Sequence, residues 1–312
     1  MKKDLNLTEG AIGAAFGLCA PIAIAFLAVI VATIMGVDTE NSVFVTIINI
    51  ITELCFVLGV YYICKRNETS FTNATKINAK PSAKIIGLAF LLGVVCLFLF
   101  NPIISLWESL LGAIGYQISA ELPFGLNSPG MVIFAIFTVA LLPAICEEFL
   151  FRGVVLNGLR GIGAKQCIIY SALIFGLMHQ SLQQLPYTII LGLISGVLLY
   201  YTRSLLPSML FHFTNNAIVI LFMAFPRLSE ILFSWWIALE SILALQIIVA
   251  ILCVLLACLI IYFMIKSLKK QFDPANEETC SVSIFRTKQL VIPLCVGILF
   301  LIISTIPKFG VI

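Results

Sequence analysis

The sequence predicts an all-α, polytopic membrane protein with about eight or nine transmembrane helices and a catalytic cavity between them. Hydrophobic residues occupy 61% of the 312 positions, charged residues only 11%, and the mean hydropathy is +1.13. A soluble domain carries about twice that charged fraction. Apolar runs of about 20 residues, the length of one bilayer crossing, follow one another along the chain. We therefore expect residues 1–312 to form one membrane domain without a sizeable soluble part.

The apolar runs divide into nine expected spans. These cover residues 11–36, 42–63, 84–106, 129–159, 166–182, 186–202, 204–225, 240–266 and 289–307. The fourth run is longer than one crossing and contains Pro143, which should bend the helix or free a backbone carbonyl. Residues 228–239 contain Trp235 and Trp236 and are expected at the interface, because Trp favours the headgroup level.

Basic residues gather on alternate loops, which predicts the orientation. One side receives Lys2, Lys3, Lys65, Arg66, Lys76, Lys80, Lys84, Arg160, Lys165, Arg203, Lys266, Lys269, Lys270, Arg286 and Lys288. The other side has only Arg227 and Lys308 as cations. The positive-inside rule then predicts a multi-pass protein of the cell (plasma) membrane with a cytoplasmic N-terminus. These cations are expected to set topology; the lipid bilayer is the predicted partner, and nucleic acid is not.

Intramembrane polarity is concentrated in three short clusters. They read EEFLFR (147–152), FGLMH (175–179) and HFTNN (212–216), and they contain the only two histidines of the chain. Polar and ionisable groups are costly in hydrocarbon and tend to mark a working site. The rise of 1.5 Å per residue places all three clusters about 12–20 Å from one membrane edge. A single converged site is the simplest account.

Helical spacing suggests a role for each residue. Glu148 and Arg152 are four apart and should pair, because an unpaired charge is costly there. Glu147 is rotated by about 100° and can face another partner, for which we expect His179. A carboxylate beside an imidazole can deprotonate water.

The remaining cluster residues complete such a site. His212 and Asn216 share a face and can supply two oxyanion donors. Phe175 lies one turn before His179 and can wall the pocket or fix its ring. These residue types suit hydrolysis of an amide within the membrane.

The three clusters resemble the motifs of the CAAX prenyl protease and bacteriocin-processing family, also called the Abi or type II CAAX family of intramembrane proteases. Its signature is EExxxR, FxxxH, and HxxxN or HxxxD on separate helices, and here all three motifs are present in that order. The motif residues are Glu147, Glu148, Arg152, Phe175, His179, His212 and Asn216. The resemblance covers about residues 129–225, which we expect to be the catalytic core.

The resemblance implies an intramembrane endopeptidase with a cavity facing the cytoplasm. Glu147 activates water in that scheme, His179 assists, His212 and Asn216 hold the oxyanion, and Arg152 braces the site through Glu148. It leaves open a metalloprotease using a divalent metal such as zinc, with Glu147, His179 and His212 as candidate ligands. The implied partner is a peptide or membrane-protein substrate, and in a bacterial host bacteriocin processing or immunity.

Other interpretations remain open at the level of sequence. A proton-coupled transporter would also use buried Glu and His, but no inverted repeat is visible. A non-catalytic immunity or scaffold protein would have no need of a buried base. Cys146 could be a thiol nucleophile, although no basic neighbour activates it. Glu53 and Glu240 are interpreted as helix-end residues, with a proton path or an ion site as alternatives. Gly192 and Gly196 suggest close helix packing.

Overall fold

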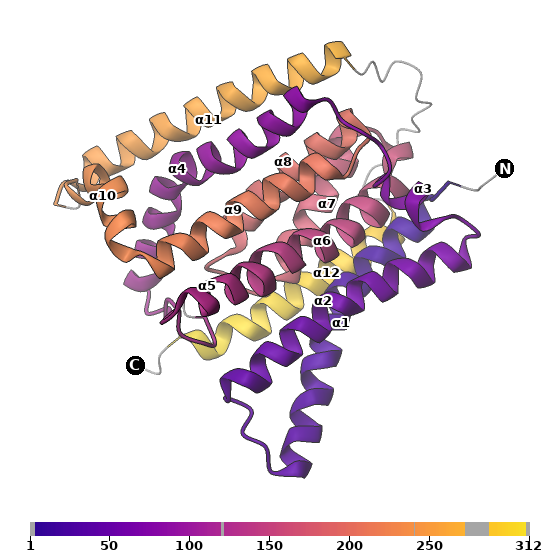
Figure 1. Ribbon diagram of the computed structural model, residues 1–312, viewed down its shortest axis with the longest axis horizontal. Coiled ribbons are helices and arrows are strands. Elements are labelled where there is room, and N and C mark those ends of the chain that lie inside the picture. Colours follow the sequence, from indigo (N-terminus) through magenta and orange to yellow (C-terminus); the bar gives the residue numbers. More distant parts are fainter. Residues whose placement is uncertain (1–3, 120–121, 240, 272–286, 310–312) are drawn as a thin grey trace.

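A computed structural model describes residues 4–119, 122–239, 241–271 and 287–309, which form a bundle of long helices (Figure 1). Eight of these helical segments are long and apolar enough to cross a membrane, and they confirm the predicted polytopic all-α class. They are α1 (Leu7–Met35), α2 (Ser42–Arg66), α4 (Ala83–Ala113), the continuous run Pro129–Leu156, α8 (Leu185–Thr202), α9 (Leu206–Ala224), α11 (Leu243–Gln271) and α12 (Lys288–Thr305).

The expected span 166–182 is shorter than predicted. Its helix, α7 (Ala164–Met178), has 15 residues and ends before the polar stretch that follows. The chain leaves the helix because Gln180 adopts a left-handed conformation with φ 49°, directly after His179. The residues 179–184 therefore form a loop, and this loop lies beside the cavity described below.

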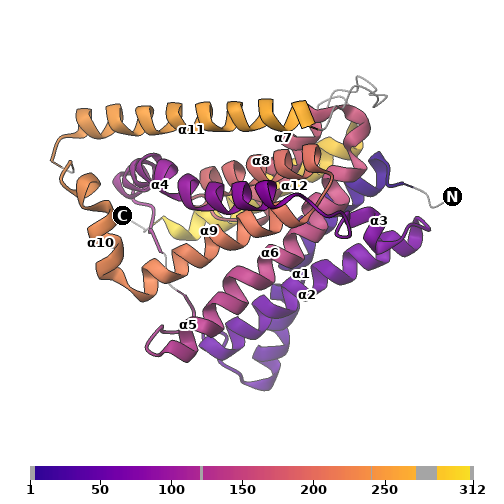
Figure 2. The same cartoon turned by 45° about the horizontal axis from the view of Figure 1, so that its top comes forward.

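The run Pro129–Leu156 lies in the middle of the bundle. It packs against α1 and α2 on one side and against α7, α8 and α9 on the other. The α1–α2 hairpin forms one edge of the molecule, and α11 lies beside α4 along the opposite edge (Figures 1 and 2). Helices α7 and α8 approach closely at Gly192, where an added Cβ would lie 2.8 Å from the Ala172 Cα. That contact confirms the packing role predicted for this glycine.

The bundle has two ends that differ in charge. At one end, called the basic end here, lie α3 (Phe71–Thr75), η3 (Arg160–Ile162) and the turn at Arg203. At the other, called the far end, lie the 114–128 loop (described at residues 114–119 and 122–128), the 179–184 loop, α10 (Pro226–Ile237) and η5 (Ile306–Lys308). The N and C labels stand at opposite ends of the bundle (Figure 1).

Candidate active site

The helix that carries the two glutamates is irregular on both sides of them. It consists of α5 (Pro129–Ala135), η1 (Ile136–Leu141), α6 (Leu142–Glu148) and η2 (Phe149–Leu156), and both η segments are π-helical. Pi-helical turns are rare and frequently occur at functional sites. Pro143 lies in α6 directly after η1, and the freed carbonyl predicted there is that of Val139, described below. The irregular turns of this run present Glu147 and Glu148 to different neighbours.

Glu148 joins two of the predicted motifs. Its Oε1 lies 3.2 Å from Arg152 Nη1 and 3.1 Å from His212 Nδ1. The expected Glu148–Arg152 pair is therefore present, and both side chains are fully buried. The bond to His212 was not foreseen, because sequence spacing links residues of one helix only. A carboxylate accepts hydrogen bonds, so the Nδ1–H of His212 donates to Glu148, which fixes the orientation of the ring.

We predicted that Glu147 would face His179, but in the structure it faces His212. Its Oε2 lies 3.9 Å from His212 Nε2, too long for a direct hydrogen bond. Glu147 forms no ion pair or hydrogen bond with His179 among the described residues. The Oε2 atom of Glu147 is buried without a hydrogen-bond partner, and the side chain lines the cavity.

Glu53 is a site residue that the sequence interpretation missed. It lies in the interior of α2, which packs against α6, so the helix-end interpretation is wrong. Its carboxyl is within hydrogen-bonding contact of the Glu147 carboxyl. Two carboxylates this close repel each other unless they share a proton. The position of Glu53 within an apolar run could have marked it as a site residue. Its partner Glu147 lies on another helix, so sequence spacing could not show the contact. The other such residue, Glu240, lies outside the described residues.

Phe175 organises the two histidines. Its ring centroid lies 5.0 Å from that of His179 and 5.7 Å from that of His212, both edge-to-face. The Arg152 guanidinium covers the same ring at 4.2 Å. The His179 Nδ1 lies 2.8 Å from the carbonyl of Phe175, an arrangement in which Nδ1–H donates and Nε2 is left as the base. Phe175, which we predicted to wall the pocket or fix the His179 ring, thus lies at the centre of the cluster.

Asn216 is held against the irregular helix. Pro143 has no N–H to offer the Val139 carbonyl four residues earlier, and the Asn216 Nδ2 donates to that carbonyl at 3.2 Å. A carboxamide has a second N–H, and Asn216 lines the cavity. The neighbouring Asn215 is buried and donates to the Tyr187 hydroxyl. Asn216 is therefore fixed with one donor to spare.

The polar clusters meet at a cavity of about 500 Å³. Glu147, His179, His212 and Asn216 all line it, together with Phe175. Pockets of this size bind small ligands or short peptide segments. Cys146 is buried and is not among the lining residues, so it is poorly placed to be a nucleophile.

The cavity extends towards the far end. Beyond the cluster it is lined by Glu108 near the end of α4, Ser119 of the 114–128 loop and Gln183 of the 179–184 loop. Gln183 Nε2 donates to Glu108 Oε1 at 2.7 Å, so these segments form one wall. Of the described residues, none from α3, η3 or the Arg203 turn lines the cavity.

The donor set does not form a metal site as it is arranged. Within the described ranges, no three His, Cys, Asp or Glu side chains are grouped closely enough to hold an ion. Glu147 and His212 are near each other, but the Nδ1 of His212 is already bonded to Glu148 and His179 lies apart. We derive no chemical step through a metal.

Comparison with protein families gives one result for this region. Residues 129–218 match a family model described as type II CAAX prenyl endopeptidase Rce1-like. The matched segment contains the glutamate pair, both histidines and Asn216. No curated protein and no solved structure matches the chain.

Proposed function

We propose that the chain is an intramembrane protease of the type II CAAX prenyl endopeptidase Rce1-like family, whose model matches residues 129–218. In this proposal it hydrolyses peptide bonds with a water molecule activated by Glu147. The observation that carries this proposal is the convergence of Glu147, His179, His212 and Asn216 on one cavity from three separate segments. A general base must reach the water that it deprotonates, and Glu147 lines the cavity beside His212.

The reaction follows from the contacts of each group. Glu147 takes a proton from water while the water oxygen bonds to the peptide carbonyl carbon. His212 Nε2–H and the second N–H of Asn216 then donate to the oxyanion. As the C–N bond breaks, the proton held by Glu147 passes to the leaving amine, and the products are a free amine and a carboxylic acid. His179 Nε2 accepts a hydrogen bond from the same water.

The charges of the cluster support this assignment. The Arg152 guanidinium lies against Glu148, and the two ring nitrogens of His212 face Glu148 and Glu147. The Glu53 and Glu147 carboxyls can share one proton, which lowers the negative charge of the group. This matters because uncompensated charge in hydrocarbon is costly. We assign Glu53 as a positioning residue for Glu147.

We further propose that the peptide reaches the site from the far end. The support is the line of cavity residues from Glu147 to Ser119. If the basic end is cytoplasmic, as the positive-inside rule predicts, the mouth lies on the extracytoplasmic side. The substrates would then be exported or membrane-embedded peptide segments. The family resemblance favoured the cytoplasmic face, so the direction is open to a direct test.

The catalytic test uses full-length protein in liposomes with a library of prenylated CAAX-like peptides and leader-like transmembrane peptides. We expect Glu147→Gln to lower kcat by about 10²- to 10⁴-fold, the range for loss of a general base. Cys146→Ala, at the neighbouring position outside the cavity, serves as the control and should retain activity. Equal cleavage by wild type and Glu147→Gln would contradict the proposed role of Glu147. A chelator arm tests metal dependence in the same assay.

The direction of access is tested with single cysteines in a background that lacks the native ones. Ser119→Cys places a thiol at the cavity mouth, and Asn78→Cys places one on an exposed loop of the basic end. A membrane-impermeant maleimide added to intact cells should label Ser119→Cys and inhibit cleavage. Asn78→Cys should react only after permeabilisation. The reverse labelling pattern would place the cavity mouth in the cytoplasm.

A further inference from the structure

The catalytic cavity contains a carboxylate that the proposed reaction does not use. Glu108 lies near the end of α4, and the cavity reaches it beyond the cluster of Glu147 and His212. Much of the remaining wall is apolar and includes Ile104, Leu122, Val139, Ile220 and Met223. A charged group in apolar surroundings is costly unless it is paired, so the presence of Glu108 calls for an explanation.

The position of Glu108 is fixed by neighbouring hydrogen bonds. Gln183 Nε2 donates to Glu108 Oε1 at 2.7 Å, and Gln183 Oε1 accepts from the backbone N–H of Ser119 at 3.2 Å. A carboxylate cannot donate and a backbone N–H cannot accept, so these contacts fix the orientation of the buried Gln183 carboxamide. One residue earlier in each segment, Trp107 Nε1 donates to the Leu182 carbonyl at 3.0 Å. Glu108 is therefore held against the loop that follows α7.

Glu108 has no cationic partner in the part of the chain that the structure describes. Its Oε1 accepts from a neutral amide, and its Oε2 forms no hydrogen bond or ion pair with a described residue. No described Lys or Arg lines the cavity. Lys308 contacts the same wall from outside, with its Nζ 3.4 Å from Ser119 Oγ, but it forms no ion pair with Glu108. One carboxylate oxygen thus remains available to a ligand.

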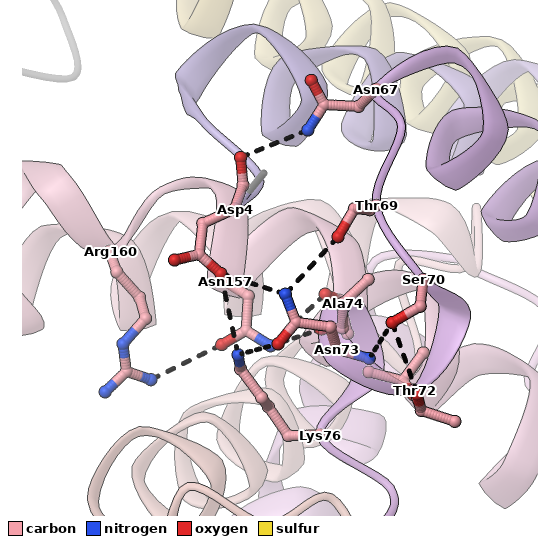
Figure 3. A network of polar contacts seen from close by, with 12 residues as sticks. Asp4, Asn67, Thr69, Ser70, Thr72, Asn73, Ala74, Lys76, Asn157 and Arg160 are labelled. Carbon is pink, nitrogen blue, oxygen red and sulfur yellow. Dashed lines mark hydrogen bonds and ion pairs between the residues drawn. The ribbon is translucent and has the colours of Figure 1, made fainter. Parts of the chain in front are cut away.

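A carboxylate at the basic end shows the usual arrangement. Asp4 Oδ1 lies 4.0 Å from Lys76 Nζ and accepts from Asn73 Nδ2 at 3.2 Å (Figure 3). If Glu108 served only to tie the cavity wall together, a neutral acceptor for Gln183 would suffice. The charge of Glu108 has no such counterpart among the described residues, and a bound substrate can supply one.

The chemistry of the wall indicates the kind of cation. A divalent ion such as Ca²⁺ takes about six to eight oxygen ligands, whereas Glu108 offers one free carboxylate oxygen. One such oxygen matches an ammonium or guanidinium group, which binds carboxylates by charge-assisted hydrogen bonds. Lys and Arg also carry long aliphatic stems that pack along apolar surface. Ile104 and Leu122 line the same cavity and provide such a surface.

We propose that Glu108 binds a Lys or Arg side chain of the peptide substrate and so selects peptides with a basic residue near the cleaved bond. The proposal rests on the proposed cleavage function and adds a specificity residue to it. Gln183 follows His179 by four residues, so their Cα atoms are at most about 14 Å apart. An extended peptide covers this distance in about four residues. The basic residue is therefore expected within about five residues of the cleaved bond.

The first test measures binding to full-length Glu147→Gln protein, so that affinity is observed without turnover. A single Lys, Gln or Glu is moved along an otherwise neutral leader-like peptide that is acetylated at its amino terminus and carries a neutral fluorophore. At one position, we expect the Lys peptide to bind at least about tenfold more tightly than the Gln peptide, as for a hydrogen bond between charged groups. Adding Glu108→Gln should remove this difference, and adding Glu108→Lys should favour the Glu peptide.

Controls separate charge from structure. Glu108→Gln keeps an acceptor for Gln183, so the wall should remain intact. Glu230→Gln is the matched control, because it removes a carboxylate of the far end at an exposed position of α10 outside the cavity. It should leave the preference for Lys unchanged. A preference that appears only with a free amino terminus would overturn the assignment to a side chain and assign Glu108 to the terminal ammonium.

The second test measures cleavage of the same peptides by otherwise unaltered protein. Glu108→Gln should raise KM for the Lys peptide about tenfold, with kcat nearly unchanged and the neutral peptide unaffected. A preference for Lys in binding without cleavage of any peptide would contradict the proposed reaction and keep the role of Glu108. Equal affinity for Lys and Gln peptides at every position, or a preference that persists in Glu108→Gln, would overturn the role of Glu108 alone.

Discussion

The two sides of the Glu147–His212 pair are packed in opposite ways. Towards the basic end, Glu148, Arg152, Leu150 and Phe151 have no exposed surface. Towards the far end, a cavity of about 500 Å³ extends to Ser119. The difference separates two tasks within one cluster. The packed side fixes the carboxylate and the imidazole, and on the open side both side chains border the cavity.

The largest expected effect is on the packed side. Arg152→Met removes the cation that pairs with the buried Glu148 carboxylate. Breaking a buried pair from one side costs about 3–5 kcal/mol, because the other charge is left uncompensated. Unfolding in mixed micelles should show this loss of stability. The double variant Arg152→Met, Glu148→Gln is the control and should recover much of it. A small effect of Arg152→Met alone would mean that the packed side does not carry the fold.

Asn216→Ala tests the open side. Removing one oxyanion donor lowers kcat by about 10²- to 10³-fold in characterised hydrolases. The loss of the bond to the Val139 carbonyl should cost only about 1 kcal/mol of stability. The matched control is Val219→Ala, one turn further along the same wall of the cavity and without a polar group. If Asn216→Ala unfolds the protein as severely as Arg152→Met, the proposed division between the two sides is wrong.

The effects expected for Glu53 lie between those for Arg152 on the packed side and those for Asn216 on the open side. Glu53→Leu removes a hydrogen bond to a charged group, worth about 1.5–3 kcal/mol. We therefore expect kcat to fall by about 10- to 100-fold with KM nearly unchanged. Glu53→Gln keeps a donor for the Glu147 carboxylate and should restore most of the rate. A merely structural role would give parallel losses in both variants and no such rescue.

A larger side chain at the cavity mouth tests whether the substrate enters from the open side. Leu122 lines the cavity from the 114–128 loop, and Leu122→Trp should raise KM about tenfold, equivalent to about 1.4 kcal/mol. Leu206 is exposed at the basic end, so Leu206→Trp is the control. A rise in KM for Leu206→Trp alone would indicate access from the packed side.

The sequence alone determined the class of the protein and pointed to most residues of the candidate site. Apolar runs of bilayer length predict spanning helices, because the hydrocarbon core fixes their length. The cost of burying charge made Glu147, His179 and His212 stand out, and spacing along one helix correctly paired Glu148 with Arg152.

Only the tertiary structure decided which groups meet across helices. Helical period says which way a side chain points but not which helix lies opposite, so the Glu147–His212, Glu148–His212 and Glu53–Glu147 contacts could not be predicted. The direction of the cavity also depended on packing. It results from dense apolar contacts on one side of the cluster and from the shortness of α7 on the other. Depth along the membrane is encoded locally, whereas contact between segments is a property of the assembled bundle.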